Sequence, residues 1–401
     1  MKNIRLRRFY MKKVVALILT FIFIASSVTV LSGCSGDSGT LKEIPLSDRE
    51  NPVIGKVGDY EIRLDEWDFL YNSYYSQYVN MYGKEAAEQD EGKKAISDKT
   101  CAALKINAAA LSVAAEYGIT PENEKVKEYV AKKLEELASE LTDEISAGLE
   151  GDDETASNED INELYKKYLA ESRLTDRYNR FVFAVDGCIN QTVEKCLADG
   201  KLLTEETAVI DYIKNNFVRV WTVKLTVGGE SDREQKREEA ELLEWIMKTD
   251  FTVSENCDLF KEKLGITVAT ESNKNLRSFY NRIVSADSAQ AKMKVLIGSK
   301  YNSDNYMTTL HGYYFTYGEY FEEFEKAAFD LDEGEVSGII ASGDAYYIIM
   351  RLALEGDYIN EAYDTLNYQY QYSYVNRMID SRKAELSFTP DGTVLIPGYI
   401  G

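Results

Sequence analysis

The chain has little of what hydrolytic or metal-dependent enzymes use most. It contains one histidine, His311, and five cysteines, none of them in a Cys-x-x-Cys spacing. A structural zinc site needs four Cys or His ligands at short spacings, and neither an H-E-x-x-H nor a G-x-S-x-G motif is present. The sequence therefore predicts no metal site, no cofactor and no hydrolase triad.

Basic residues and prolines are also scarce. The chain has 46 Lys and Arg against 68 Asp and Glu, which gives a net charge of -22. Binding to nucleic acid depends on clustered Lys and Arg that contact phosphates, so this charge balance argues against a nucleic-acid partner. Only five prolines and 25 glycines interrupt the sequence, which favours long helices because both residues disfavour a helix interior.

The N-terminus is the basic exception, and it has the pattern of an export signal. Basic residues are followed by an apolar run from Val14 to Val30, as in a secretory signal peptide. The next residues, Leu31 to Cys34, resemble the lipobox of bacterial lipoproteins. The resemblance implies that residues 1–33 are removed and that Cys34 is lipidated. An uncleaved anchor helix is the alternative, because the apolar run is just long enough to span a bilayer.

Lipidation of Cys34 would place the protein on the extracytoplasmic face of the cell membrane. Paired acyl chains give stable attachment to a bilayer where a single chain is marginal. Residues 34–52 are small, polar and without periodicity, and are predicted to be a flexible tether behind the lipidated cysteine. Together with the resemblances below, the lipobox indicates a Gram-positive origin.

Residues 53–215 have almost only helical periodicity after a short hairpin at 53–62. Gly58 lies in the hairpin turn, and Trp67, Leu70 and Tyr74 follow at helical spacing. These residues resemble the opening of the chaperone domain shared by PrsA-type foldase lipoproteins and SurA, in which V-x-x-V-N-G-x-x-I precedes the first helix. Val57 stands here at the position of the family asparagine. The resemblance implies a helical chaperone domain over 53–215.

Alternation with a period of two begins at Phe217 and predicts a half-buried strand to Val227. Further on, the chain resembles the parvulin family of peptidyl-prolyl isomerases. The matching motifs are an aromatic pair, an F-x-x-A-x-F helix, a G-E-V-S turn and a strand ending in H-I-I, found here as Tyr314–Phe315, Phe324–Phe329, Gly334–Ser337 and Tyr347–Ile349. The resemblance implies a parvulin-like domain over 216–355. Residues 252–289 exceed the family's length at this point and are interpreted as an inserted lobe.

The family's site residues carry over only in part. Asp304 keeps the aspartate position, Tyr347 replaces the last histidine, and His311 falls in the preceding loop. The family's first histidine falls on either Thr222 or Lys224, and the sequence leaves this register open. By resemblance, the proline pocket consists of Tyr320, Phe324 and Phe329.

Both family histidines are thus absent from the catalytic positions. The pKa of tyrosine, ordinarily near 10, does not reproduce a histidine pair near neutrality. The sequence therefore favours binding over catalysis, although the catalytic candidates Asp304, Tyr347 and His311 leave an active isomerase open.

Residues 356–401 return to helical periodicity. In the PrsA and SurA proteins the C-terminal segment packs onto the N-terminal helices. The resemblance thus implies an α+β fold with a mostly helical, discontinuous SurA-N-like chaperone domain. A parvulin-like domain, with an FKBP-like antiparallel sheet plus helices, is inserted into it.

The predicted function is that of a membrane-anchored extracytoplasmic folding factor that binds unfolded or translocating polypeptides. An active parvulin-type isomerase is the first alternative. A solute-binding lipoprotein of an importer is the second, and it would require repeated βαβ units. Whether the protein forms a homodimer is left open.

Overall fold

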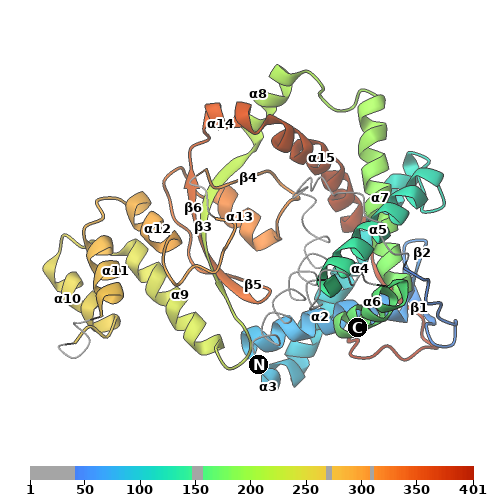
Figure 1. Cartoon of the computed structure of the whole chain (residues 1–401), viewed down its shortest axis with the longest axis horizontal. Helices are drawn as coiled ribbons and strands as arrows, with labels where there is room; N and C mark the ends of the chain where they lie inside the picture. Colours follow the sequence, from blue (N-terminus) through green and yellow to red (C-terminus); the bar gives the residue numbers. More distant parts are fainter. Residues whose placement is uncertain (1–40, 147–156, 268–272, 308–310) are drawn as a thin grey trace. The chain divides into compact units, whose positions relative to one another are not determined.

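A computed structural model describes residues 41–146, 157–267, 273–307 and 311–401 (Figure 1). The predicted signal peptide and the lipidation site at Cys34 lie outside these residues. The chain divides into two compact units, each assembled from separate segments. The helical unit comprises residues up to Tyr74, Lys93–Thr204 and Gln371–Gly401, and the sheet unit comprises Tyr75–Gly92 and Glu205–Tyr370. The α+β fold and the discontinuous helical domain are thereby confirmed, whereas the boundaries given above for each domain stay a prediction.

The helical unit contains a small antiparallel sheet in the order β2-β1-β7. Strands β1 (Val53–Val57) and β2 (Tyr60–Arg63) form the predicted hairpin, with Gly58 at a φ of 57° in its turn. Strand β7 (Phe388–Pro390) pairs with the other edge of β1. A Cβ atom on Gly55 would lie 2.5 Å from the carbonyl oxygen of Thr389. Only glycine therefore allows β7 to approach β1 this closely.

Helices make up the rest of the helical unit. Trp67 is fully buried on the first of them, and its ring packs against Tyr71, Phe388 and Tyr399. The helices that lie wholly or partly in this unit are α2 (Leu64–Tyr82), α4 (Asp90–Glu116), α5 (Glu124–Ser146), α6 (Asn158–Ser172), α7 (Asp176–Ala198) and α15 (Tyr363–Glu385).

The sheet unit is built on a four-stranded antiparallel sheet in the order β4-β3-β6-β5. The long central strands β3 (Val218–Thr226) and β6 (Ala345–Leu352) pair along their length, and the edge strands β4 (Tyr313–Phe315) and β5 (Ile340–Ser342) are short. The remaining helices of this unit are α3 (Lys84–Glu88), α8 (Glu206–Asn216), α9 (Arg233–Lys248), α10 (Ser254–Lys263), α11 (Lys274–Val284), α12 (Ala289–Ile297), α13 (Glu322–Asp330) and α14 (Gly356–Glu361). Every strand pair in the described residues is antiparallel. These sheets lack the parallel βαβ units that the importer alternative requires.

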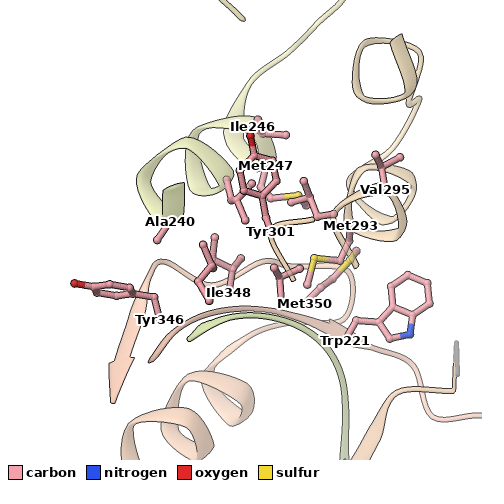
Figure 2. Packing of buried hydrophobic residues seen from close by; sticks show 14 of the residues in the cluster. Trp221, Ala240, Ile246, Met247, Met293, Val295, Tyr301, Tyr346, Ile348 and Met350 are labelled. Carbon is pink, nitrogen blue, oxygen red and sulfur yellow. The ribbon is translucent and has the colours of Figure 1, made fainter. Parts of the chain in front are cut away.

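Alternation along β3 and β6 gives the sheet two different apolar faces. On one face Trp221, Ile348 and Met350 pack against α9 and α12 (Figure 2). The predicted lobe at 252–289 belongs to this same core, because Phe260 of α10 is fully buried within it. On the other face Val220 and Ile349 pack beneath α13. The candidate site lies on this second face.

Candidate functional site

The register of β3 against β6 decides which residue faces Tyr347. Lys224 pairs with Tyr347, and Thr222 pairs with Ile349. Residues paired across neighbouring strands project to the same face, so all four side chains share the face covered by α13. Lys224 therefore lies directly opposite Tyr347, whereas the choice between Thr222 and Lys224 for the position of the family's first histidine stays a prediction.

Six aromatic side chains gather on this face, and we call them the aromatic cluster: Tyr313, Phe315, Tyr320, Phe321, Phe324 and Tyr347. Phe324 of α13 is buried and lies at its centre, with ring centroids 5.1 Å from Tyr320 and 5.8 Å from Tyr347. The Phe321 ring lies 5.3 Å from that of Tyr347. The structure thus brings together three predicted site residues, Tyr320, Phe324 and Tyr347.

Asp304 joins the cluster through Tyr313. The Tyr313 hydroxyl lies 2.9 Å from both carboxylate oxygens of Asp304, and burial together with the Asp304 charge raises the pKa of Tyr313. The hydroxyl therefore stays protonated and donates. The loop before Asp304 is fixed to β3, because the Ser303 amide donates to the Lys224 carbonyl at 2.7 Å. Asp304 is thereby held beside the strand that carries Lys224.

Lys224 is the one cation of this group. Burial disfavours its charge, but Tyr347, Asp344 and Asp304 outweigh this effect and raise the pKa of Lys224, so the ammonium stays charged. Its Nζ lies 5.6 Å from the centre of the Tyr347 ring. Among the described residues no carboxylate oxygen lies within 4.0 Å of it. Lys224 is half-buried and so remains partly accessible to solvent.

Thr222 carries a polar atom that nothing in the described part of the chain satisfies. Its side chain is 2% exposed, and its Oγ1 has no hydrogen-bond partner there. A buried hydroxyl without a partner lowers stability. Thr222 lies on the same face as Lys224, two residues before it.

Replacement of Thr222 by valine is expected to stabilise the sheet unit. Thr222→Val removes the unpartnered hydroxyl and keeps the branched shape, so we expect the free energy of unfolding to rise by about 1 kcal/mol. Urea unfolding followed by fluorescence measures the change. Thr226→Val is the matched control, because the Thr226 hydroxyl lies 2.8 Å from that of Ser303 and its loss should not stabilise. A destabilised Thr222→Val protein would contradict the expectation.

The two remaining predicted residues lie away from the centre of the cluster. His311 Nδ1 is 2.8 Å from Glu355 Oε2, and its ring stacks on that of Tyr358 at 4.3 Å. Glu355 also forms an ion pair with Arg219 at 2.7 Å. Phe329 borders the cluster, stacking on Tyr317 at 3.7 Å and meeting Phe315 edge-on at 6.2 Å. His311 thus belongs to a separate ion-pair group, and its catalytic role stays a prediction.

Glu319 lies in the turn that carries Tyr320 of the aromatic cluster, and the sequence did not predict it as a site residue. The Thr316 amide donates to Glu319 Oε1 at 2.8 Å, and the amides of Glu319 and Tyr320 both donate to Glu325 Oε1 at 2.7 Å. Burial, with a smaller contribution from the Glu325 charge, raises the pKa of Glu319 to about 8. These bonds fix the turn that carries Tyr320.

A proton on Glu319 accounts for two unpartnered acceptors. Glu319 Oε2 and Gln369 Oε1 are both buried and have no donor among the described residues. The Gln369 side chain lies within hydrogen-bond reach of Glu319 and lowers the pKa of Glu319, but burial outweighs this effect. A protonated Glu319 can donate to Gln369 Oε1, because a neutral carboxyl group carries one O–H donor. We therefore infer that Glu319 is neutral at about pH 7.

Strand parity provides a signal for some of the residues that the sequence analysis missed. Tyr313 lies two residues before Phe315 and thus on the same face of β4. Phe321 directly precedes α13, where it takes the N-cap position. No comparable signal marks Glu319, because a Gly-Glu pair within a turn is typical of an exposed loop.

Within residues 41–146, 157–267, 273–307 and 311–401, no group of three or more His, Cys, Asp or Glu side chains is placed to hold a metal ion. In the same residues, no helix has the length and apolar character needed to cross a membrane.

Comparison with known protein families identifies both parts of the chain. Residues 2–140 match the SurA-like N-terminal domain, and residues 269–353 match the PPIC-type PPIASE domain. The second match includes Asp304, the aromatic cluster and Tyr347, whereas β3 with Lys224 precedes it. The two matches define a protein that joins a SurA-like domain to a parvulin-type isomerase domain.

The chain is accordingly of the PrsA/SurA type with a parvulin domain, which confirms the resemblance seen in the sequence. Similar solved structures include the foldase PrsA from Streptococcus pneumoniae, at 14% identity over 75% of this chain and 86% of that one, with a TM-score of 0.23. PrsA from Bacillus anthracis matches at 14% identity over 70% and 96% of the two chains, also with a TM-score of 0.23. Similarity at this level carries no argument about function. No curated protein matches the chain.

Proposed function

We propose that this protein is a membrane-anchored extracytoplasmic folding factor that binds unfolded secreted polypeptides. Its parvulin-like domain, residues 216–355, would hold client segments without strong isomerase catalysis. One observation carries the proposal: Lys224 faces Tyr347 of the aromatic cluster, and the chain's one histidine lies in a different group. Lipidation of Cys34 would keep the protein where exported chains emerge.

The cluster has the groups needed for binding an apolar side chain. Tyrosine and phenylalanine offer large apolar area, and tyrosine adds a polar tip. Rotation about an X-Pro bond has a barrier of about 18 to 20 kcal/mol because the twisted amide loses resonance. Only interactions that are stronger in the twisted state lower that barrier. Aromatic contacts with a side chain are similar in both states, so they contribute affinity rather than rate.

Replacement of Phe321 by serine tests whether clients bind at the cluster. Phe321 is the N-cap of α13 and makes no side-chain cap bond, so serine removes the ring while supplying a favourable cap. An aromatic contact contributes about 1 kcal/mol, and we therefore expect Phe321→Ser to need roughly fivefold more protein to suppress aggregation of reduced insulin. Light scattering measures the effect.

The control for this test is Tyr82→Ser, which removes an exposed aromatic ring that is not part of the cluster. It should suppress aggregation as well as the unaltered chain does. Equal suppression by Phe321→Ser would show that clients do not bind at the cluster.

An active isomerase is the second candidate function, and the retained Asp304 with its bond from Tyr313 favours it. In this alternative Asp304 and Tyr347 form the polar network around the prolyl amide, and Tyr320 and Phe324 hold the proline ring. Clear acceleration of prolyl isomerisation in a short peptide by the unaltered chain would select this alternative.

A further inference from the structure

Helix α11 of the predicted inserted lobe, together with α12 after it, is basic in a chain whose net charge is -22. Residues 273–300 contain six Lys or Arg and one acidic residue, Asp287. Three of the basic residues lie on α11, which carries no acidic residue at all. A segment whose charge is opposite to that of the rest of the molecule indicates an anionic partner of its own.

One face of α11 is fixed in the core of the sheet unit. The helix lies between α10 and α12 (Figure 1). Its Phe279 and Tyr280 rings have centroids 6.3 and 5.3 Å from that of Phe260, and Ile283 is fully buried. This packing determines which side of α11 faces solvent.

The basic residues of α11 lie on the other side, and we call them the basic face: Lys274, Arg277 and Arg282. Because an α-helix has 3.6 residues per turn, Lys274 projects opposite Ile283 and the two arginines flank it. All three basic residues are exposed, and the exposed residues between them are the neutral Ser278 and Asn281. The solvent side of α11 thus presents positive charge without a carboxylate of its own.

We propose that the basic face of α11 contacts the headgroups of an anionic lipid bilayer. This contact goes beyond the proposed function, because it involves neither a client nor the aromatic cluster. It would be a second membrane contact in addition to the lipid at Cys34, and it gives the inserted lobe a role.

The shape and charge of this surface favour a bilayer over an acidic polypeptide. Peptides are usually held in a groove or along the edge of a sheet, whereas the convex outer side of a helix can lie on a plane of headgroups. The acidic remainder of the chain does not prevent this contact. At physiological ionic strength the Debye length is about 8 Å, so charges farther from the bilayer are largely screened.

Vesicle binding by a chain tethered at its N-terminus tests the inference. Each protein begins at Ser35 and carries a hexahistidine tag in place of the lipid, so that a nickel-chelating lipid holds every variant at the same end. Vesicles of phosphatidylcholine, with or without phosphatidylglycerol, supply the anionic and the neutral surface. Sedimentation gives the affinity of each protein for each vesicle.

The test variant replaces the whole basic face by glutamine: Lys274→Gln/Arg277→Gln/Arg282→Gln. On anionic vesicles it should bind about a hundredfold more weakly than the unaltered tagged chain, because each basic residue near such a surface contributes about fivefold. Lys274→Gln alone should lose about fivefold. On phosphatidylcholine both variants should match the unaltered chain, and the difference on anionic vesicles should shrink at about 1 M salt.

A matched control removes three charges from exposed lysines of α5 in the helical unit: Lys125→Gln/Lys127→Gln/Lys132→Gln. It changes the net charge of the chain by the same amount and should bind both kinds of vesicle as the unaltered chain does. A control as weak as the α11 variant would show that net charge, and not the basic face, governs binding. That result would overturn the inference.

Equal binding of the α11 variant and the unaltered chain to anionic vesicles would also overturn it, as would an equal loss on phosphatidylcholine. Polyglutamate represents the competing partner. If it binds the unaltered chain but not the α11 variant, and vesicles do not distinguish the two, the basic face binds acidic polypeptides and the inference fails. Suppression of insulin aggregation is not a readout here, so this contact and the proposed function can fail separately.

Discussion

Glu319→Gln is expected to remove most of the pH dependence of the stability of the sheet unit between about pH 5 and pH 8. The pKa of Glu319 is raised by burial from 4.5 to about 8 in the folded protein. The folded state therefore binds this proton more tightly than the unfolded state. The free energy of unfolding falls as the pH rises from about 4.5 to about 8, and the loss amounts to roughly 3 to 5 kcal/mol.

Glutamine reproduces the neutral form of this side chain. Its carbonyl can accept from the Thr316 amide, and its NH₂ group can donate to Gln369 Oε1, which has no donor among the residues that the structure describes. Glu319→Gln should thus match the unaltered protein at about pH 5 and exceed it at about pH 8. Urea unfolding at a series of pH values measures both.

Glu322→Gln serves as the control for this experiment, because Glu322 is exposed in the first turn of α13. It removes one carboxylate without touching the buried group, and the slope of stability against pH should stay as in the unaltered protein. If Glu319→Gln kept that slope too, Glu319 would have to be ionised in the folded protein at neutral pH.

Histidines at both Lys224 and Tyr347 are expected to give the protein isomerase activity. The two positions face each other across β3 and β6, with Asp304 held beside them. One preorganised polar contact to a transition state is worth on the order of 10² in rate, so we expect kcat/KM to rise about tenfold to a hundredfold over the unaltered chain.

Isomerisation of Ala-Leu-Pro-Phe at about pH 7 measures this gain. The single variants Lys224→His and Tyr347→His are the controls, and each should gain less than the pair. A folded double variant no faster than the unaltered chain would show that the missing imidazoles do not limit catalysis.

The motif spacing predicted much of the candidate site. The F-x-x-A-x-F helix and the final strand place Phe324 and Tyr347 in one cluster, because spacing along a helix and a strand fixes which face each side chain takes. The same reasoning could not choose between Thr222 and Lys224. Both lie on one face of β3, and only the pairing with β6 distinguishes them.

Other features depend on residues far apart in the chain and could not be read locally. Glu319 is buried, and Gln369, 50 residues later in the chain, lies within hydrogen-bond reach of it. His311 contacts Glu355 and stacks on Tyr358, and so lies apart from the aromatic cluster. A sequence pattern contains the propensity of each segment but not these pairings.

The pairing of β7 with β1 also determines when the helical unit can be completed during synthesis. A chain is made from its N-terminus, and domains generally fold as they emerge. The β1–β2 hairpin appears early, but an isolated hairpin is marginal in water. The strand that pairs with the other edge of β1 consists of residues 388–390. This edge therefore stays unpaired until nearly the whole chain has been made. The sheet unit, whose last segment ends at Tyr370, is complete before then, and any chain that stops short of Phe388 leaves β1 with an open edge.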